Sequence, residues 1–195
     1  MLVMGGNMMK KILLGLSFIL LLVVGCANTM NTPTKKVEEL LGKYQKMDTA
    51  VLTQLDNVIS EDTTMTDEQK KEYRSLMEKQ YQNLSYKIKG EEITGDDATV
   101  DVEIEVLDYA TSINESKKYY SEHRDEFNDE KIDRTDTMVD EDNKYIDYKI
   151  KMLKNVTDRK KYDITFNLRK DKDDNWKLED ISDIDRQKIH GLYEG

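Results

Sequence analysis

The chain has 195 residues with 40 acidic and 30 basic side chains, so its formal net charge is −10. This acidic balance disfavours nucleic-acid binding, because phosphate contacts depend on clustered lysine and arginine. The single cysteine excludes a disulfide within the chain, so packing alone must stabilise the folded part. A length of this order predicts one domain.

Residues 1–25 have the order of properties found in a bacterial export signal. Lys10 and Lys11 form a basic segment, which is followed by 13 uncharged, mostly apolar residues at 12–24 and by the small Gly25. Thirteen residues are too few to cross a bilayer, which needs about 20. We therefore predict that residues 1–25 are removed. Three methionines fit equally as the translation start: Met1, Met8 and Met9.

Cys26 follows directly on Val23-Val24-Gly25, and this run resembles the lipobox of bacterial lipoproteins, with Val23 where leucine is commonest. The resemblance implies a diacylglyceryl group on the Cys26 sulfur and cleavage between Gly25 and Cys26. Each buried methylene contributes about 0.8 kcal/mol, and two acyl chains hold a protein firmly on a membrane. We expect a lipid-anchored protein on the extracytoplasmic face of the cell membrane. The alternative is a small buried cysteine in an uncleaved helix.

The mature chain would begin with a lipidated cysteine and flexible spacer at 26–34, followed by a single domain at 35–195. Removing residues 1–25 takes away two lysines and no acidic residue, so the formal net charge becomes −12. At roughly 3.3 Å per residue the spacer reaches about 25 Å. Pro33 is expected to precede or open a helix, with Thr34 as its possible cap.

Apolar residues three and four apart predict a first helix over about 34–59. A capping box at Thr66 to Gln69 predicts the start of a second helix. Residues 112–130 return to helical spacing, and the acidic stretch 131–142 is expected to be a loop. Residues 143–156 fit both a helix and a strand, and we prefer the helix.

Alternating residues predict strands in two places. Val100, Val102, Ile104 and Val106 alternate with acidic residues after a turn at 95–97 and a strand near 86–93. This pattern is typical of a half-buried antiparallel strand, and we interpret the acidic row as a solvated face rather than a cation site. Residues 162–168 and 176–181 flank a polar turn at 171–175 and predict a closing hairpin.

This order of elements resembles the cystatin-like and nuclear transport factor two-like α+β folds. The resemblance implies N-terminal helices packed on a curved antiparallel sheet of about four strands. The whole layout, with the ending Ile189-His190-Gly191-Leu192-Tyr193, is similar to a group of surface lipoproteins of Gram-positive bacteria. These relatives supply no activity that could be carried over, because fold alone does not define chemistry.

The search for catalytic, metal-binding and cofactor-binding residues identifies none. The two histidines, His123 and His190, are far apart in sequence. His123 adjoins an apolar stripe beside Tyr119 and Tyr120, which makes it the candidate ligand-binding residue, against the alternative of an ordinary surface or partly buried histidine.

Two acidic runs suggest calcium, and we interpret both as solvated loops. Asp171, Asp173 and Asn175 match the first ligands of an EF-hand loop. Trp176 replaces its glycine, however, and Ser182 replaces its bidentate glutamate. The run at 140–143 lacks a defined spacing.

Two classes of function remain. The first is a non-enzymatic binding module that recognises a peptide, an envelope component or a small ligand through the concave face of the sheet. The alternative is a pocket enzyme of the nuclear transport factor two-like type, an isomerase or dehydratase using His123 or a buried aspartate. A ligand-sized cavity lined by His123 would favour the enzyme, and a cavity filled by Tyr, Ile and Trp176 would favour the binding module.

Overall fold

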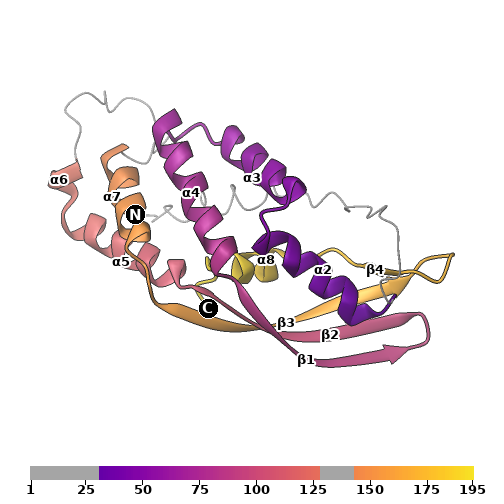
Figure 1. The fold of residues 1–195 in the computed structure, drawn as a ribbon. Coiled ribbons are helices and arrows are strands. Elements are labelled where there is room, and N and C mark those ends of the chain that lie inside the picture. Colours follow the sequence, from indigo (N-terminus) through magenta and orange to yellow (C-terminus); the bar gives the residue numbers. More distant parts are fainter. Residues whose placement is uncertain (1–30, 128–142) are drawn as a thin grey trace, which may run out of the picture.

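The computed structural model describes residues 31–127 and 143–195, which form an α+β domain (Figure 1). Its helices pack on a curved, open, antiparallel sheet with the strand order β1-β2-β3-β4, which confirms the predicted fold class. The predicted signal segment 1–25, Cys26 and the stretch 131–142, predicted as a loop, lie outside the described residues. Within those residues, no helix is long and apolar enough to span a membrane.

The predicted first helix is in fact two helices, α2 (Pro33–Gln45) and α3 (Thr49–Glu61). Met47 between them has a φ of 57°, a left-handed conformation that ends α2. The Asp48 side chain accepts a hydrogen bond from the backbone N–H of Ala50 and so caps α3. A short acidic side chain placed before a helix competes for backbone donors in this way, although the apolar spacing continues across the break.

The cap of α2 also differs from the prediction. Pro33 is the first helical residue, as expected, but the cap is Thr32, whose hydroxyl accepts from the N–H of Lys35. Thr34 lies inside the first turn and instead donates its N–H and hydroxyl to Glu91. The N–H of a residue inside the first turn has no partner within the helix, so a side chain from a strand can accept from it.

The remaining helices follow the sequence pattern more closely. α4 (Asp67–Asn83) begins with the predicted capping box of Thr66 and Gln69. α5 (Tyr109–Glu122) and α6 (Arg124–Phe127) cover most of the predicted 112–130 helix. α7 (Asn143–Lys154) confirms the helical interpretation of 143–156. A short helix near the C-terminus, α8 (Asp183–Ile189), was not predicted.

The sheet consists of β1 (Ser85–Thr94), β2 (Asp97–Leu107), β3 (Arg159–Lys170) and the short β4 (Trp176–Leu178). Alternation along β2 and β3 places apolar side chains under the helices and polar ones on the opposite face. The buried side of these strands forms the core together with α2, α3 and α4. The core residues of the sheet are Ala98, Val100, Val102, Ile104, Val106, Tyr162, Ile164, Phe166, Leu168 and Trp176.

The other face of the sheet is a layer of ion pairs. Glu103 pairs with Lys89 at 3.1 Å and with Lys161 at 3.2 Å, and this pairing lowers the pKa of its carboxyl group. Asp97 pairs with Arg169 at 2.6 Å. The acidic row of Asp101, Glu103 and Glu105 is thus on an outward face, as predicted. Basic residues of neighbouring strands pair with Glu103 and with Glu105, which lies 3.3 Å from Arg159.

Candidate functional site

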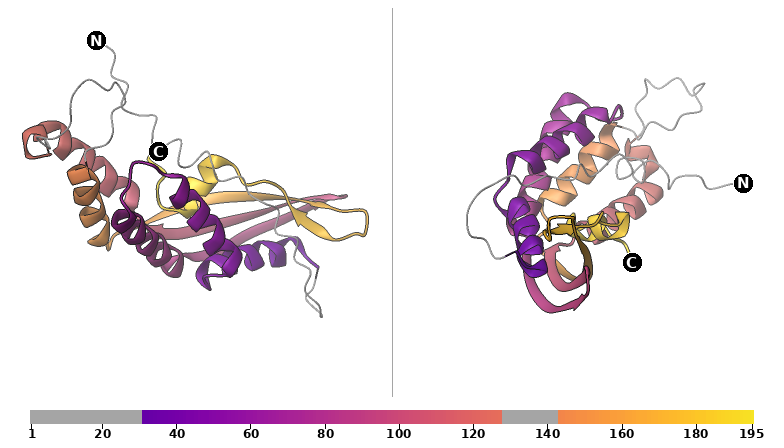
Figure 2. Two further views of the ribbon diagram at one scale, coloured as in Figure 1. Left: turned by 90° about the horizontal axis from the view of Figure 1, so that it is seen from above. Right: turned by 90° about the vertical axis from the view of Figure 1, so that its right-hand side faces the viewer.

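Six aromatic side chains gather where α5, α6 and α7 meet, and we call this group the aromatic cluster. Its members are Tyr119, Tyr120, His123, Phe127, Tyr145 and Tyr148, with ring centroids 4.1–6.1 Å apart between contacting pairs. The three helices lie at one end of the elongated domain, and the turns of the two hairpins lie at the other end (Figures 1 and 2). The cluster is therefore separate from the core between the sheet and helices α2, α3 and α4.

His123 forms part of a short column of stacked rings. Its imidazole stacks on Tyr119 with centroids 4.1 Å apart and an interplanar angle of 14°. Tyr119 also stacks on Tyr148 at 5.0 Å and 21°. His123 is the C-cap of α5, and its Nδ1 lies 3.0 Å from the carbonyl oxygen of Tyr119. The ring is thus held by local contacts of the helix end.

Charged groups surround the cluster. The hydroxyl of Tyr119 donates to Glu126 at 2.9 Å, and this hydrogen bond raises the pKa of Tyr119. The Arg124 guanidinium lies over the Tyr120 ring at 5.7 Å, and the Lys149 ammonium lies over the Tyr145 ring at 5.4 Å. Aromatic rings with such neighbours are suited to stacking and to cation–π contacts.

Part of this cluster could be predicted from the sequence. His123, Tyr119 and Tyr120 were recognised as neighbours on one helix. Tyr145 and Tyr148 were missed as partners, because they come from α7, which is more than 20 residues further along the chain. Their spacing of three residues places both on one side of a helix, and this is the signal that could have indicated a second aromatic face.

His190 occupies a different environment. It is 4% exposed and packs against the rings of Tyr81 at 5.5 Å and Tyr44 at 6.3 Å. Neither ring nitrogen has a hydrogen-bond partner. Burial, with a smaller effect of Arg186, lowers the pKa of His190 to about 4. A neutral histidine without polar partners in the core has a packing role.

The Asp171–Asn175 run forms the turn between β3 and β4. One Asp171 oxygen accepts from the N–H groups of Asp173 at 2.9 Å and Asn175 at 3.0 Å, and the other lies 3.5 Å from the Lys177 ammonium. The two N–H hydrogen bonds are the main reason that the pKa of Asp171 is lowered. Among the described residues, no group of three or more His, Cys, Asp or Glu side chains could hold a metal ion. Residues 140–142 of the other acidic run are not described.

A scan against protein-family models finds no match, and neither the curated proteins nor the solved structures yield one.

Proposed function

We propose that this chain is a bacterial lipoprotein, anchored by a lipid on Cys26 to the extracytoplasmic face of the cell membrane, whose domain is a non-enzymatic binding module. The observation that carries the proposal is the Val23-Val24-Gly25-Cys26 run after a basic pair and an uncharged segment. The domain begins soon afterwards, because Thr32 caps the first described helix. Its partner would be an envelope protein, a peptide or a small ligand.

The aromatic cluster is the surface we assign to binding. The face of the sheet under the helices is filled by its own side chains, so a ligand would have to displace the core. The outer face of the sheet carries charged groups that are largely paired with one another. In the cluster, by contrast, the rings of Tyr119, Tyr120 and Tyr148 are half-buried and so keep part of their surface exposed. Aromatic rings exposed in this way are enriched at recognition surfaces.

The pocket-enzyme alternative would need a cavity lined by His123. Trp176 and Tyr162 are 5% and 8% exposed, so both rings fill the space under the helices. His123 stacks on Tyr119 in the aromatic cluster instead of facing the sheet. These placements support the choice of a binding module over an isomerase or dehydratase.

Mass spectrometry of the mature N-terminus tests the anchor. We expect a diacylated Cys26 as the first residue, and we expect Cys26→Ser to leave the protein unprocessed and without lipid. An intact signal segment or an unmodified Cys26 in the wild-type protein would refute the anchor.

A photo-crosslinking residue at Tyr148 tests the binding surface in intact cells, with the same residue at Glu92 on the outer sheet face as the matched control. We expect one recurrent crosslinked partner from Tyr148 and none from Glu92. The same products in equal yield from both positions would remove the aromatic cluster from the proposal.

A further inference from the structure

The chain enters the domain at the turn between β3 and β4. The Asn31 side chain donates through Nδ2 to the carbonyl oxygen of Asp174 at 2.8 Å, and its Oδ1 accepts from the backbone N–H of Trp176 at 3.1 Å. Asn31 and Asp174 are 143 residues apart in the sequence. This contact fixes the start of the described chain to the end of a hairpin.

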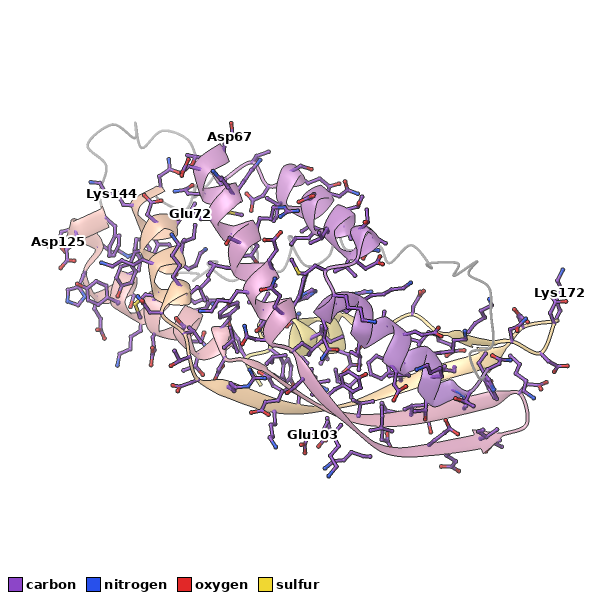
Figure 3. The ribbon with its side chains drawn as sticks, viewed as in Figure 1. Asp67, Glu72, Glu103, Asp125, Lys144 and Lys172 are labelled. Carbon is purple, nitrogen blue, oxygen red and sulfur yellow. The ribbon has the colours of Figure 1, made fainter. Side chains whose placement is uncertain are left out.

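The next residues attach to the other hairpin. Thr34 donates its backbone N–H and its hydroxyl to Glu91 Oε2 of β1, at 2.8 and 2.6 Å. The Pro33 ring between these two attachments is buried. The entry point is therefore held by both hairpins, and we call residues 31–34, 94–97 and 169–177 the turn end of the domain. Lys172 marks this end in Figure 3, and Asp125 of α6 marks the opposite end.

The covalent reach from Cys26 to this point is short. Five residue steps separate Cys26 from Asn31, and a fully extended chain covers at most about 18 Å over that length. The spacer predicted from sequence was longer, because it included Thr34, which the structure places inside α2. A lipid on Cys26 would thus keep the turn end within this distance of the membrane surface.

The charge of the turn end is compatible with that position. Residues 95–97 and 169–177 contain five aspartates and four lysines or arginines, so this region is almost neutral in an otherwise acidic chain. Three pairs account for most of these charges, Asp97 with Arg169, Asp171 with Lys177 and Asp96 with Lys170. An almost neutral surface can approach anionic phospholipid headgroups without the repulsion that an acidic one would meet.

We propose that the turn end is the surface of this domain that faces the phospholipid headgroups, and that the α5–α6 end, with the aromatic cluster, points away from the membrane. This inference rests on the proposed anchor at Cys26. It assigns the membrane-facing surface, which the anchor alone does not define, and it places the binding surface where envelope partners are accessible.

Energy transfer to the membrane tests the orientation on the lipidated full-length protein. A lipidated Cys26 has no free thiol, so a cysteine introduced by Lys172→Cys or Asp125→Cys is the only site for a donor dye. The variants are reconstituted in vesicles of phosphatidylcholine and phosphatidylglycerol that carry a headgroup acceptor dye. We expect transfer from position 172 to exceed that from position 125 by at least about twofold, because the tether limits only the turn end. Equal or reversed transfer in vesicle-bound protein would overturn the orientation and leave the anchor intact.

A longer tether supplies the matched control. Inserting about ten glycine and serine residues between Asn28 and Thr29 adds a flexible coil without touching the domain. We expect the insertion to lower transfer from position 172 and to reduce its excess over position 125. An unchanged excess would overturn the claim that the short tether sets the orientation. Protein that does not float with the vesicles, and whose Cys26 itself takes the dye, would refute the anchor and the orientation together.

Discussion

The side-chain amide of Gln80 hydrogen-bonds both backbone groups of Leu107. Gln80 Oε1 accepts from the Leu107 N–H at 2.9 Å, and Nε2 donates to the Leu107 carbonyl oxygen at 2.9 Å. The same Nε2 donates to the carbonyl oxygen of His190 at 2.8 Å. Gln80 is fully buried, so one side chain joins α4, the end of β2 and the end of α8 where no water can replace it.

Replacing Gln80 should therefore destabilise the whole domain. We expect Gln80→Leu to lower the free energy of unfolding by about 3 kcal/mol, because it leaves three buried backbone groups without partners. Urea unfolding followed by the fluorescence of Trp176 would measure the change. Gln45→Leu is the matched control, since Gln45 donates one hydrogen bond to the carbonyl oxygen of Leu84 at 2.9 Å. The loss of this hydrogen bond should lower the free energy of unfolding by about 1 kcal/mol. Equal losses in the two variants would contradict the role of Gln80.

Gly191 packs directly on the same amide. Its φ is +69°, and a Cβ atom there would lie 2.0 Å from Gln80 Nε2 and 2.2 Å from the Leu107 carbonyl oxygen. We expect Gly191→Ala to destabilise the domain by about 3 kcal/mol or more, through overpacking and the strained φ together. Gly95→Ala is the control, because Gly95 has a φ of +64° with open space around it and should cost about 1 kcal/mol. Thermal unfolding of both variants separates the two effects, because only Gly191→Ala adds a steric clash to the backbone strain. A similar loss of stability in the two variants would show that the structure relieves the clash.

The sequence is informative where the pattern is local. The alternation at residues 100–106 predicts a strand with one buried face because side chains point alternately to the two faces of a sheet. The Thr66–Gln69 capping box likewise needs only four neighbouring residues, and the structure contains it. The spacing of apolar residues at 143–156 fits both a helix and a strand, so the sequence alone could not decide between them. In the structure Ile146, Ile150 and Leu153 are buried in one core, and their spacing is that of a helix.

Features that depend on distant contacts could not be predicted. Gln80 looks like an ordinary polar helix residue, and its burial depends on Leu107 and His190, which lie 27 and 110 residues away. Met47 ends a helix although the apolar spacing continues past it, because the residue adopts a left-handed conformation. In the candidate site, the ring that stacks beyond Tyr119 belongs to Tyr148, which comes from another helix, α7.

The turn at 171–175 should not respond to calcium. The Asp171 carboxylate is occupied by two backbone N–H groups and by Lys177. An EF-hand loop instead directs its carboxylates at the ion and closes with a bidentate glutamate. We expect neither about 1 mM calcium nor a chelator to change the melting temperature by more than about 1 °C. This calcium concentration is well above the dissociation constants of EF-hand sensor sites. Magnesium at equal concentration controls for ionic strength, and a calcium-specific rise that Asp171→Asn abolishes would contradict this interpretation.

The buried His190 should make the domain sensitive to mild acid. Its pKa is about 4 in the folded chain, whereas an unfolded histidine titrates near 6.5. Between these two pH values the unfolded chain binds more protons than the folded chain. The contribution of neutral His190 to the free energy of unfolding is therefore complete above about pH 6.5 and is lost as the pH falls toward 4. The shift corresponds to about 3 kcal/mol at most.

His190→Phe removes the titratable group and keeps an aromatic ring against Tyr44 and Tyr81. The substitution breaks no hydrogen bond, because neither His190 nitrogen has a partner. We expect the variant to match the wild type within about 1 kcal/mol at neutral pH, and to exceed it by about 2 kcal/mol near pH 4.5, because only the wild type must keep a neutral imidazole there. Urea unfolding at both pH values measures the difference. His123→Phe, outside the core, should retain the wild-type loss of stability in acid. If His190→Phe loses as much stability between the two pH values as the wild type does, then His190 is not the group responsible.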